Sequence, residues 1–416
     1  MAGQAEAKPK ADLLLAGAGQ VLTCAPVGDD PAGAQPGAWV AVQGERILAV
    51  AQPQELERQV DTSEARVVRV DGKVLAPGFV DAHTHLVFGG SRAAEYAARL
   101  THSAAEVRAL GIPSGIQATL RMTRQAALDE LVEGARERLG QMLRHGTTTA
   151  ESKSGYGLSL EGELRLLQAN QRLAASQPVD IVSTFLGAHD FPPDMGRAEY
   201  VDLVVEEMIP RVAEAGLAQF CDVYCDEGYY TLDETRRILQ AGLEAGLRPK
   251  IHLDAYASTG AAELAVELGA VSVDHLNYTQ PGEMRRLAQA GVIGVGMPGL
   301  DFAVKHPRPF AARAMLEAGM DLALATDLCP ACYLVSMQVV MQLACRVYGL
   351  SPQQALWAST MGAAQAVGLE RDRGSLEAGK LADIQAWDLP SLDEMVYRLG
   401  NNAVCMVVKR GRVHTW

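Results

Sequence analysis

The chain has 416 residues, of which 48% are hydrophobic and 5% aromatic, and its formal net charge is −13. This length suggests one large domain plus a smaller one, and the low aromatic content favours a layered α/β protein over a β-sandwich. The negative charge argues against a nucleic-acid partner, and no uncharged apolar stretch is long enough to predict a membrane span. The polar segment 1–10 lacks the apolar region of a signal peptide, so we expect no secretion signal there. The chain has seven cysteines, an odd number, so we expect reduced thiols in a cytoplasmic protein rather than a set of disulfides.

Both ends of the chain predict short strands separated by turns. In the N-terminal part, 1–73, the strands are expected at 12–16, 38–43, 46–51 and 66–71, and in the C-terminal part, 371–416, at 383–388 and 403–409. We expect the two ends to form one small β domain beside a central domain, 74–370.

The central part alternates strand-like runs with helical patterns. The predicted strands are 74–81, 147–153, 180–187, 220–225, 249–253, 270–273, 292–297 and 322–326. The predicted helices are 127–145, 162–176, 232–245, 261–268, 281–290 and 311–318. Eight alternating units predict an α/β fold of the (β/α)₈ TIM-like barrel type, with a doubly wound open sheet as the alternative. In such barrels the catalytic residues lie at the C-terminal ends of the strands.

The first predicted barrel strand ends in two histidines. His83 and His85 stand two residues apart, directly after the apolar run 74–80. Side chains at positions i and i+2 of a strand share one face, so both imidazoles can reach one metal ion.

Further polar residues follow the other predicted strands, and five of the nine histidines lie at strand ends. The strand-end residues are Lys153, His189, Asp226, Glu227, His252, His275 and Asp327. Taken alone, each residue has an ordinary structural explanation. Asp327 could cap a helix or stand in a turn, Lys153 and Glu227 could form an ion pair, and each histidine could be a hydrogen-bonded core residue. Their convergence on one barrel face predicts a catalytic metal site.

The chemistry of these residues indicates which metal to expect. Neutral imidazoles and a carboxylate suit Zn²⁺ or Fe²⁺, and three histidines with one aspartate leave room for a water whose pKa the metal lowers. Asp327 could contact the metal and accept that water's proton. The pairs Cys221/Cys225 and Cys329/Cys332 are not expected to bind a structural zinc, because the first lies in a predicted strand and the second has no matching pair.

Seven segments carry distinctive motifs: 77–92 (PGFVDAHTHLVFGGSR), 153–158 (KSGYGL), 187–189 (GAH), 250–252 (KIH), 274–276 (DHL), 325–327 (ATD) and 374–383 (GSLEAGKLAD). These segments resemble the amidohydrolase superfamily and, more closely, the imidazolonepropionases, the ring-opening enzymes of histidine degradation. The HxH and Thr-Asp segments occur across the superfamily, whereas FGGSR and KSGYG are more particular to imidazolonepropionases.

The resemblance implies a role for each matching residue. His83, His85, His252 and Asp327 would hold one divalent metal, and His275 would position or deprotonate the water. Arg92 and Tyr156 would bind the substrate carboxylate, and His189 would contact the ring. The implied reaction is hydrolysis of 4-imidazolone-5-propanoate to N-formimidoyl-L-glutamate, by a homodimer in the cytoplasm. No lysine ends the fourth strand, where two-metal relatives carry a bridging carbamylated lysine, so one metal is expected.

Two residues depart from the family pattern. Ala255 stands where relatives usually have a glutamate, and Cys329 stands where they usually have an asparagine. Asp254 is adjacent to Ala255, but a shift of one residue places it on the other face of a strand. The alternatives are therefore a related amidohydrolase that opens or deaminates a different carboxylate-bearing ring, or a barrel that binds metal without catalysis.

Overall fold

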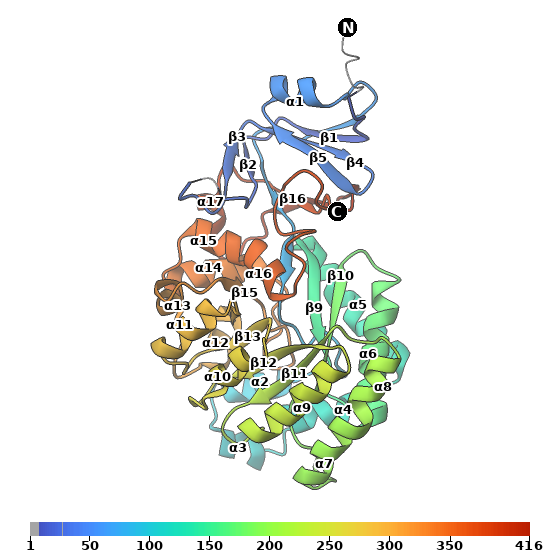
Figure 1. Ribbon diagram of the computed structural model, residues 1–416, viewed down its shortest axis with the longest axis vertical. Helices are drawn as coiled ribbons and strands as arrows, with labels where there is room; N and C mark the ends of the chain where they lie inside the picture. Colours follow the sequence, from blue (N-terminus) through green and yellow to red (C-terminus); the bar gives the residue numbers. More distant parts are fainter. Residues whose placement is uncertain (1–7, 27) are drawn as a thin grey trace.

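Eight parallel strands form the centre of the protein, whose computed structural model describes residues 8–26 and 28–416 (Figure 1). The strands neighbour one another in chain order, and helices cover their outer side. They are β8 (Phe79–Asp81), β9 (Thr147–Lys153), β10 (Asp180–Ala188), β11 (Phe220–Cys225), β12 (Arg248–Leu253), β13 (Ser272–His275), β14 (Ile293–Gly296) and β15 (Leu322–Leu324). The predicted barrel is confirmed. The prediction that segment 1–10 is not a signal peptide concerns residues of which most, 1–7, lie outside the described residues.

The barrel closes between β8 and β15 through the residues that follow these two strands. The amide of Asp327 donates to the His83 carbonyl at 3.1 Å, and the amide of His85 donates to the Leu328 carbonyl at 2.9 Å. Thr84 and Leu328 form a parallel bridge. Closure therefore sets the predicted metal ligands of the first and eighth strands side by side, and the open-sheet alternative is wrong.

The six predicted helices are all present, and each of their ends lies within two residues of its predicted position. The predicted helices are α5 (Leu128–Arg144), α6 (Leu160–Ala174), α9 (Leu232–Glu244), α10 (Ala261–Glu267), α11 (Pro281–Gln289) and α13 (Ala312–Glu317). The structure adds α1 (Pro53–Gln59), α2 (Ala93–Arg99), α3 (Ala104–Ala109), α4 (Gly115–Gln125), α7 (Arg197–Leu203), η1 (Val204–Met208), α8 (Ile209–Glu214), α12 (Pro298–Val304), α14 (Met337–Tyr348), α15 (Pro352–Ala358), α16 (Met361–Ala366) and α17 (Leu392–Tyr397). In the described part of the chain, no helix has the length and apolar character needed to cross a bilayer.

Two further sheets lie at one end of the barrel (Figure 1). One has four strands in the order β5-β4-β1-β6, and the other has six in the order β18-β17-β16-β7-β2-β3, which joins both ends of the chain. Their strands are β1 (Leu13–Ala16), β2 (Gln20–Leu22), β3 (Ala34–Pro36), β4 (Trp39–Gln43), β5 (Arg46–Ala51), β6 (Arg66–Arg69), β7 (Val74–Pro77), β16 (Ile384–Trp387), β17 (Val404–Lys409) and β18 (Arg412–His414).

The prediction of one strand over 74–81 is wrong, because the run divides at Gly78. β7 pairs with β16 and β2 in the six-stranded sheet, whereas β8 pairs with β9 in the barrel. The Gly78 amide donates to the Asp383 carbonyl and the next amide, of Phe79, donates to the Gly146 carbonyl, both at 2.9 Å. A side chain at position 78 would collide with Thr148, so the change of partner requires glycine.

Apolar residues fill the barrel interior at the N-terminal ends of the strands. Phe220 and Ile293, the first residues of β11 and β14, pack with Val182 of β10 and with alanines of α16, including Ala363. This packing closes one end of the barrel. The polar residues of the interior therefore gather at the opposite end, where the strands end.

Candidate active site

The four predicted metal ligands lie together at the C-terminal ends of the barrel strands. His83 and His85 follow β8, His252 lies on β12, and Asp327 follows β15. The rings of His83 and His252 have centroids 4.6 Å apart, and Asp327 Oδ1 lies 3.8 Å from His83 Nε2 and 3.7 Å from His85 Nε2. Ligand atoms of His83, His85 and Asp327 all lie within 4.8 Å of one another.

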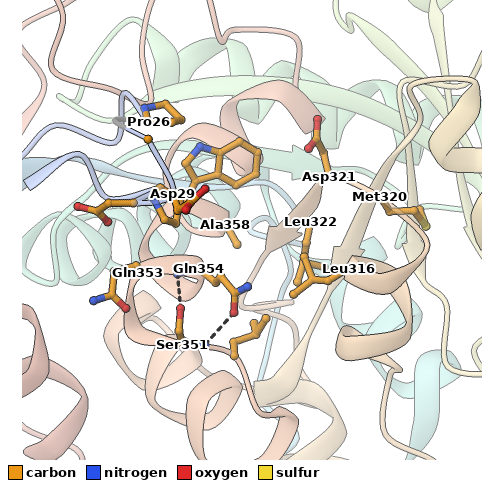
Figure 2. A pocket seen from close by; sticks show the side chains of 15 residues that line it. Pro26, Asp29, Leu316, Met320, Asp321, Leu322, Ser351, Gln353, Gln354 and Ala358 are labelled. Atoms are coloured by element: carbon orange, nitrogen blue, oxygen red, sulfur yellow. Dashed lines mark hydrogen bonds between the residues drawn. The ribbon is translucent and has the colours of Figure 1, made fainter.

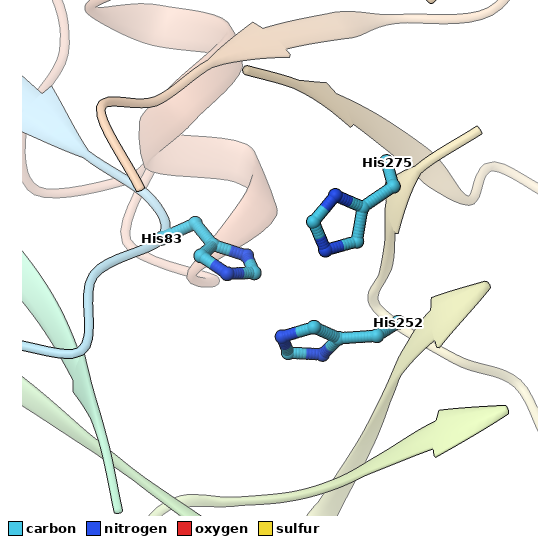
Figure 3. A group of neighbouring side chains, drawn as sticks. All are labelled: His83, His252 and His275. Carbon is cyan, nitrogen blue, oxygen red and sulfur yellow. The ribbon is translucent and has the colours of Figure 1, made fainter. Parts of the chain in front are cut away.

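His275 completes a second group with His83 and His252, whose ligand atoms also lie within 4.8 Å of one another (Figure 3). It is the last residue of β13, and its backbone has a φ of 82°. Asp327 likewise has a positive φ, of 47°. Such conformations are costly for residues other than glycine and cluster at functional sites.

The ligand atoms of this centre suit a divalent metal. His83 Nε2, His252 Nε2 and Asp327 Oδ1 are buried and have no hydrogen-bond partner among the described residues. Burial lowers the pKa of His83, His85 and His252 well below the usual value, so their imidazoles are neutral, the form that binds a metal. In the metal-free chain, burial raises the pKa of Asp327 to about 7. Polar atoms left without partners in a buried site are expensive, and a shared cation would satisfy them.

A hydrogen-bonded segment holds Asp327 against the histidines. The Asp81 carboxylate, at the end of β8, accepts from the Thr326 amide at 3.0 Å and from the Thr326 hydroxyl at 2.6 Å. Thr326 Oγ1 in turn accepts from the Leu328 amide at 3.0 Å. These contacts fix both neighbours of Asp327.

A layer of buried charges lies behind the ligands, and sequence reasoning did not predict it. Asp274 Oδ2 lies 2.6 Å from His83 Nδ1, and Asp222 Oδ2 lies 3.0 Å from His252 Nδ1. The Lys153 ammonium contacts both aspartates. One feature of the sequence could have revealed these charges. In two of the apolar strands a charged residue stands two positions before a residue of the site: Asp222 before Tyr224, and Lys250 before His252. Such pairs face the same way on a strand.

The suggested pairing of Lys153 with Glu227 is wrong. Lys153 is fully buried in the barrel, whereas Glu227 is exposed. Asp226, also noted at this strand end, accepts hydrogen bonds from the amides of Glu227, Tyr256 and Ala257 and therefore holds a turn.

His189 and Tyr156 form one wall of the site. The His189 ring stacks on His85 with centroids 4.7 Å apart, and the Tyr156 ring lies 5.4 Å from the His85 ring. His189 Nδ1 lies 3.2 Å from the Gly155 carbonyl, and burial lowers the pKa of His189 to about 4. Tyr224, which the sequence did not single out, lies nearby with its ring centroid 5.7 Å from that of His252.

Arg92 lies at the edge of the site, and its guanidinium is already paired on one side. Nε and Nη2 donate to the two carboxylate oxygens of Glu95 at 2.6 and 3.0 Å, while Nη1 has no hydrogen bond among the described residues. Burial raises the pKa of Tyr156 well above its usual value, so its phenol stays protonated and can donate a hydrogen bond.

Two cavities differ in their relation to this site. Arg92 lines a cavity of about 500 Å³, together with Pro330 and Cys332, which follow Asp327. A cavity of about 720 Å³ lies elsewhere, between residues such as Pro26 and Asp29 and residues of α13 and α15 such as Leu316 and Ala358 (Figure 2). The second cavity contains none of the predicted site residues, and of these residues the first contains Arg92 alone.

The two departures from the family pattern are both buried near the site. Ala255 presents only a methyl group. The adjacent Asp254 cannot replace a glutamate there, because its carboxylate accepts hydrogen bonds from the Thr259 amide and hydroxyl and from the Thr279 hydroxyl. Cys329 forms a tight turn with Cys332, in which each amide donates to the other residue's carbonyl at 3.0 Å.

Comparison with known proteins identifies the family. The model described as "Amidohydrolase family" matches residues 74–414. An imidazolonepropionase of Geobacillus kaustophilus is 45% identical over 379 residues, covering 90% of this chain and 89% of the relative. One of Symbiobacterium thermophilum is 43% identical over 415 residues, covering 97% of both chains.

The chain belongs to the imidazolonepropionase family of amidohydrolases. It is therefore a hydrolase of a metal-dependent family. Solved structures show the same fold at much lower identity. A zinc-bound adenosine deaminase from Xanthomonas campestris aligns with a TM-score of 0.73 at 19% identity, covering 98% of this chain and 93% of that one. The guanine deaminase of E. coli aligns with a TM-score of 0.72 at 16% identity, covering 97% and 98%.

Proposed function

We propose that this imidazolonepropionase family member hydrolyses 4-imidazolone-5-propanoate to N-formimidoyl-L-glutamate, a step of histidine degradation. The observation that carries the proposal is the position of Arg92. Its guanidinium is paired with Glu95 on one edge only and lines a cavity together with Pro330 and Cys332, which follow the predicted ligand Asp327. A substrate with a carboxylate at one end and a cyclic amide at the other fits this order of groups. Relatives named imidazolonepropionase at 45% and 43% identity support the same substrate.

We propose that one Zn²⁺ or Fe²⁺ binds to His83, His85, His252 and Asp327. When bound, such a metal polarises the amide carbonyl and lowers the pKa of a water so that it attacks near neutral pH. Four protein ligands from strands on opposite sides of the barrel would hold it rigidly. The support is that His83 Nε2, His252 Nε2 and Asp327 Oδ1 are buried without hydrogen-bond partners among the described residues, and that ligand atoms of His83, His85 and Asp327 lie within 4.8 Å of one another.

The remaining residues would orient the substrate and move protons. Arg92 would grip the propionate carboxylate through its unpaired edge, because a planar guanidinium matches a carboxylate. His189, neutral in its buried position, would contact the ring carbonyl or a ring nitrogen. His275 and Asp327 would take the proton from the attacking water and return it to the ring nitrogen that leaves, since Ala255 offers no proton-transfer group.

The product distinguishes this reaction from deamination of a related ring. Ring opening adds one water to the substrate and releases no ammonia, whereas deamination releases one ammonia for each turnover. We expect the metal-loaded chain to form N-formimidoyl-L-glutamate, identified by mass and NMR, without ammonia. Ammonia released in step with substrate loss would contradict ring opening and favour a rebuilt pocket around Ala255 and Cys329.

The remaining expectations stay predictions. These are a homodimer, a location in the cytoplasm and the boundaries of the central domain, 74–370. The seven cysteines are free thiols in the structure, as a reducing compartment would require.

A further inference from the structure

Five fully buried ionisable groups form one cluster behind the proposed metal ligands. Three are carboxylates, on Glu151, Asp222 and Asp274, and two are ammonium groups, on Lys153 and Lys250. Glu151 Oε2 and Asp222 Oδ1 have no hydrogen-bond partner among the described residues. Buried charges are costly unless they are paired with good geometry, so the cluster calls for a functional explanation.

The two lysines have different partners. The Lys153 ammonium lies 2.8 Å from Glu151, 2.7 Å from Asp222 and 3.2 Å from Asp274. The Lys250 ammonium lies 3.0 Å from Glu151, and its other hydrogen bond goes to the Ala82 carbonyl at 3.4 Å. Only Lys153 therefore bridges the two aspartates that face proposed ligands.

The aspartates in turn face the ring nitrogens that a metal would not use. Asp274 Oδ2 is hydrogen-bonded to His83 Nδ1 at 2.6 Å. Asp222 Oδ2 lies 3.0 Å from His252 Nδ1, which has no hydrogen-bond partner among the described residues, so at His252 the carboxylate acts through its charge. A carboxylate in this place favours the tautomer with the proton on Nδ1, which leaves Nε2 free to bind metal. Burial alone would lower the pKa of Lys153, but the carboxylates of Asp222, Glu151 and Asp274 raise it well above its usual value, so the ammonium stays charged.

We propose that Lys153 is a positioning residue of the metal centre: its ammonium holds Asp222 and Asp274 against His252 and His83 and thereby fixes both ligand tautomers. This inference rests on the proposed ligands but not on the proposed substrate.

Removal of the Lys153 ammonium could strengthen or weaken metal binding, and the direction shows whether Lys153 positions the ligands or is only a charge near the metal. A nearby ammonium repels a divalent cation, so removal of a mere bystander would strengthen metal binding. Removal of a residue that holds the histidines in the binding tautomer would weaken it. The two roles predict opposite results.

Two double variants provide a matched comparison. Lys153→Met/Glu151→Gln and Lys250→Met/Glu151→Gln each lose one ammonium and one carboxylate, so the net charge of the cluster is unchanged. They differ in which lysine remains, and only the second keeps the bridge between Asp222 and Asp274. Lys153→Gln, which retains a donor and much of the side-chain volume, serves as the test if the methionine variant does not fold.

The first measurement is the tautomer of His83 and His252 in the metal-free full-length chain. With ¹⁵N-labelled histidine, NMR shifts report which ring nitrogen carries the proton, and His83→Gln and His252→Gln spectra assign the signals. We expect Nδ1–H for both residues in the wild type and in the Lys250 double variant, and a mixture in the Lys153 double variant. Identical tautomers in all three proteins would overturn the proposal.

The second measurement is Zn²⁺ affinity by competition with a chelator. We expect the Lys153 double variant to bind roughly 10–100-fold more weakly than the wild type, with the Lys250 double variant within about threefold of it. Equal or tighter binding by the Lys153 double variant would overturn the role. A wild-type chain that binds no Zn²⁺ would instead contradict the proposed metal site, so the two failures are distinguishable.

Discussion

Replacing Arg92 with methionine removes the group that we expect to bind the substrate carboxylate. A guanidinium has five N–H donors, and two of them, on Nε and Nη2, already serve Glu95. The unused edge, formed by Nη1 and the second N–H of Nη2, can donate two hydrogen bonds to one carboxylate. The Arg92 side chain is only 13% exposed, so these bonds form with little screening by water.

The expected loss follows from the number of hydrogen bonds. Hydrogen bonds to charged groups contribute about 1.5–3 kcal/mol each. With a discount for the partial exposure, we expect Arg92→Met to cost about 3 kcal/mol in kcat/KM, or roughly 100-fold, on the acidic substrate. On a neutral analogue with an amide in place of the carboxylate, the loss should be small.

Arg99 offers a matched control for this variant. Its Nε lies 2.8 Å from the same Glu95, but its side chain is 52% exposed. Either substitution removes one partner of Glu95, which also accepts from the Gly115 amide. We expect Arg99→Met to leave the preference for acidic substrates intact. Equal losses on the acidic and neutral substrates in Arg92→Met, or the same loss in both variants, would refute the reasoning.

Three other substitutions test parts of the account. His83→Ala should remove the bound metal and the activity together, and metal analysis showing full occupancy would contradict the ligand assignment. Thr326→Val should lower the free energy of unfolding by about 1–3 kcal/mol, because buried Asp81 loses its hydroxyl donor; an unchanged urea denaturation midpoint would contradict this. Asp180→Asn should lower the free energy of unfolding by about 1–3 kcal/mol, since this partly exposed carboxylate pairs with Arg373 and Lys409. Burial opposes ionisation of Asp180, yet these cations hold its pKa below the usual value, so the difference from wild type should be full above pH ~4 and vanish as the pH falls through the folded pKa. A difference independent of pH would count against the ion pairs.

The sequence predicts the barrel strands well where an apolar run has clear ends. β9 and β11 have the predicted bounds, because Lys153 and Cys225 are each followed by turn residues. The break at Gly78 could not be predicted, since β7 and β8 are both fully buried and differ in the sheet that they join. Hydrophobic patterns report burial but not the partner strand.

The candidate site could be assembled from strand ends, but not the charges behind it. His252 and Asp327 are found by their position after apolar runs, whereas Asp222 and Asp274 lie inside strands and read as polar interruptions. Their roles depend on distances across the barrel, between residues far apart in the sequence. The pairing of Arg92 with Glu95, three residues apart, was within reach of sequence reasoning and was missed.

The most direct test of the central claim is the turnover of freshly prepared 4-imidazolone-5-propanoate by the wild-type chain loaded with one equivalent of Zn²⁺ or Fe²⁺. The account predicts formation of N-formimidoyl-L-glutamate with a kcat of roughly 1 s⁻¹ or more, within the ordinary range of enzymes. Turnover slower than about 0.01 s⁻¹, far below that range, would contradict the substrate assignment.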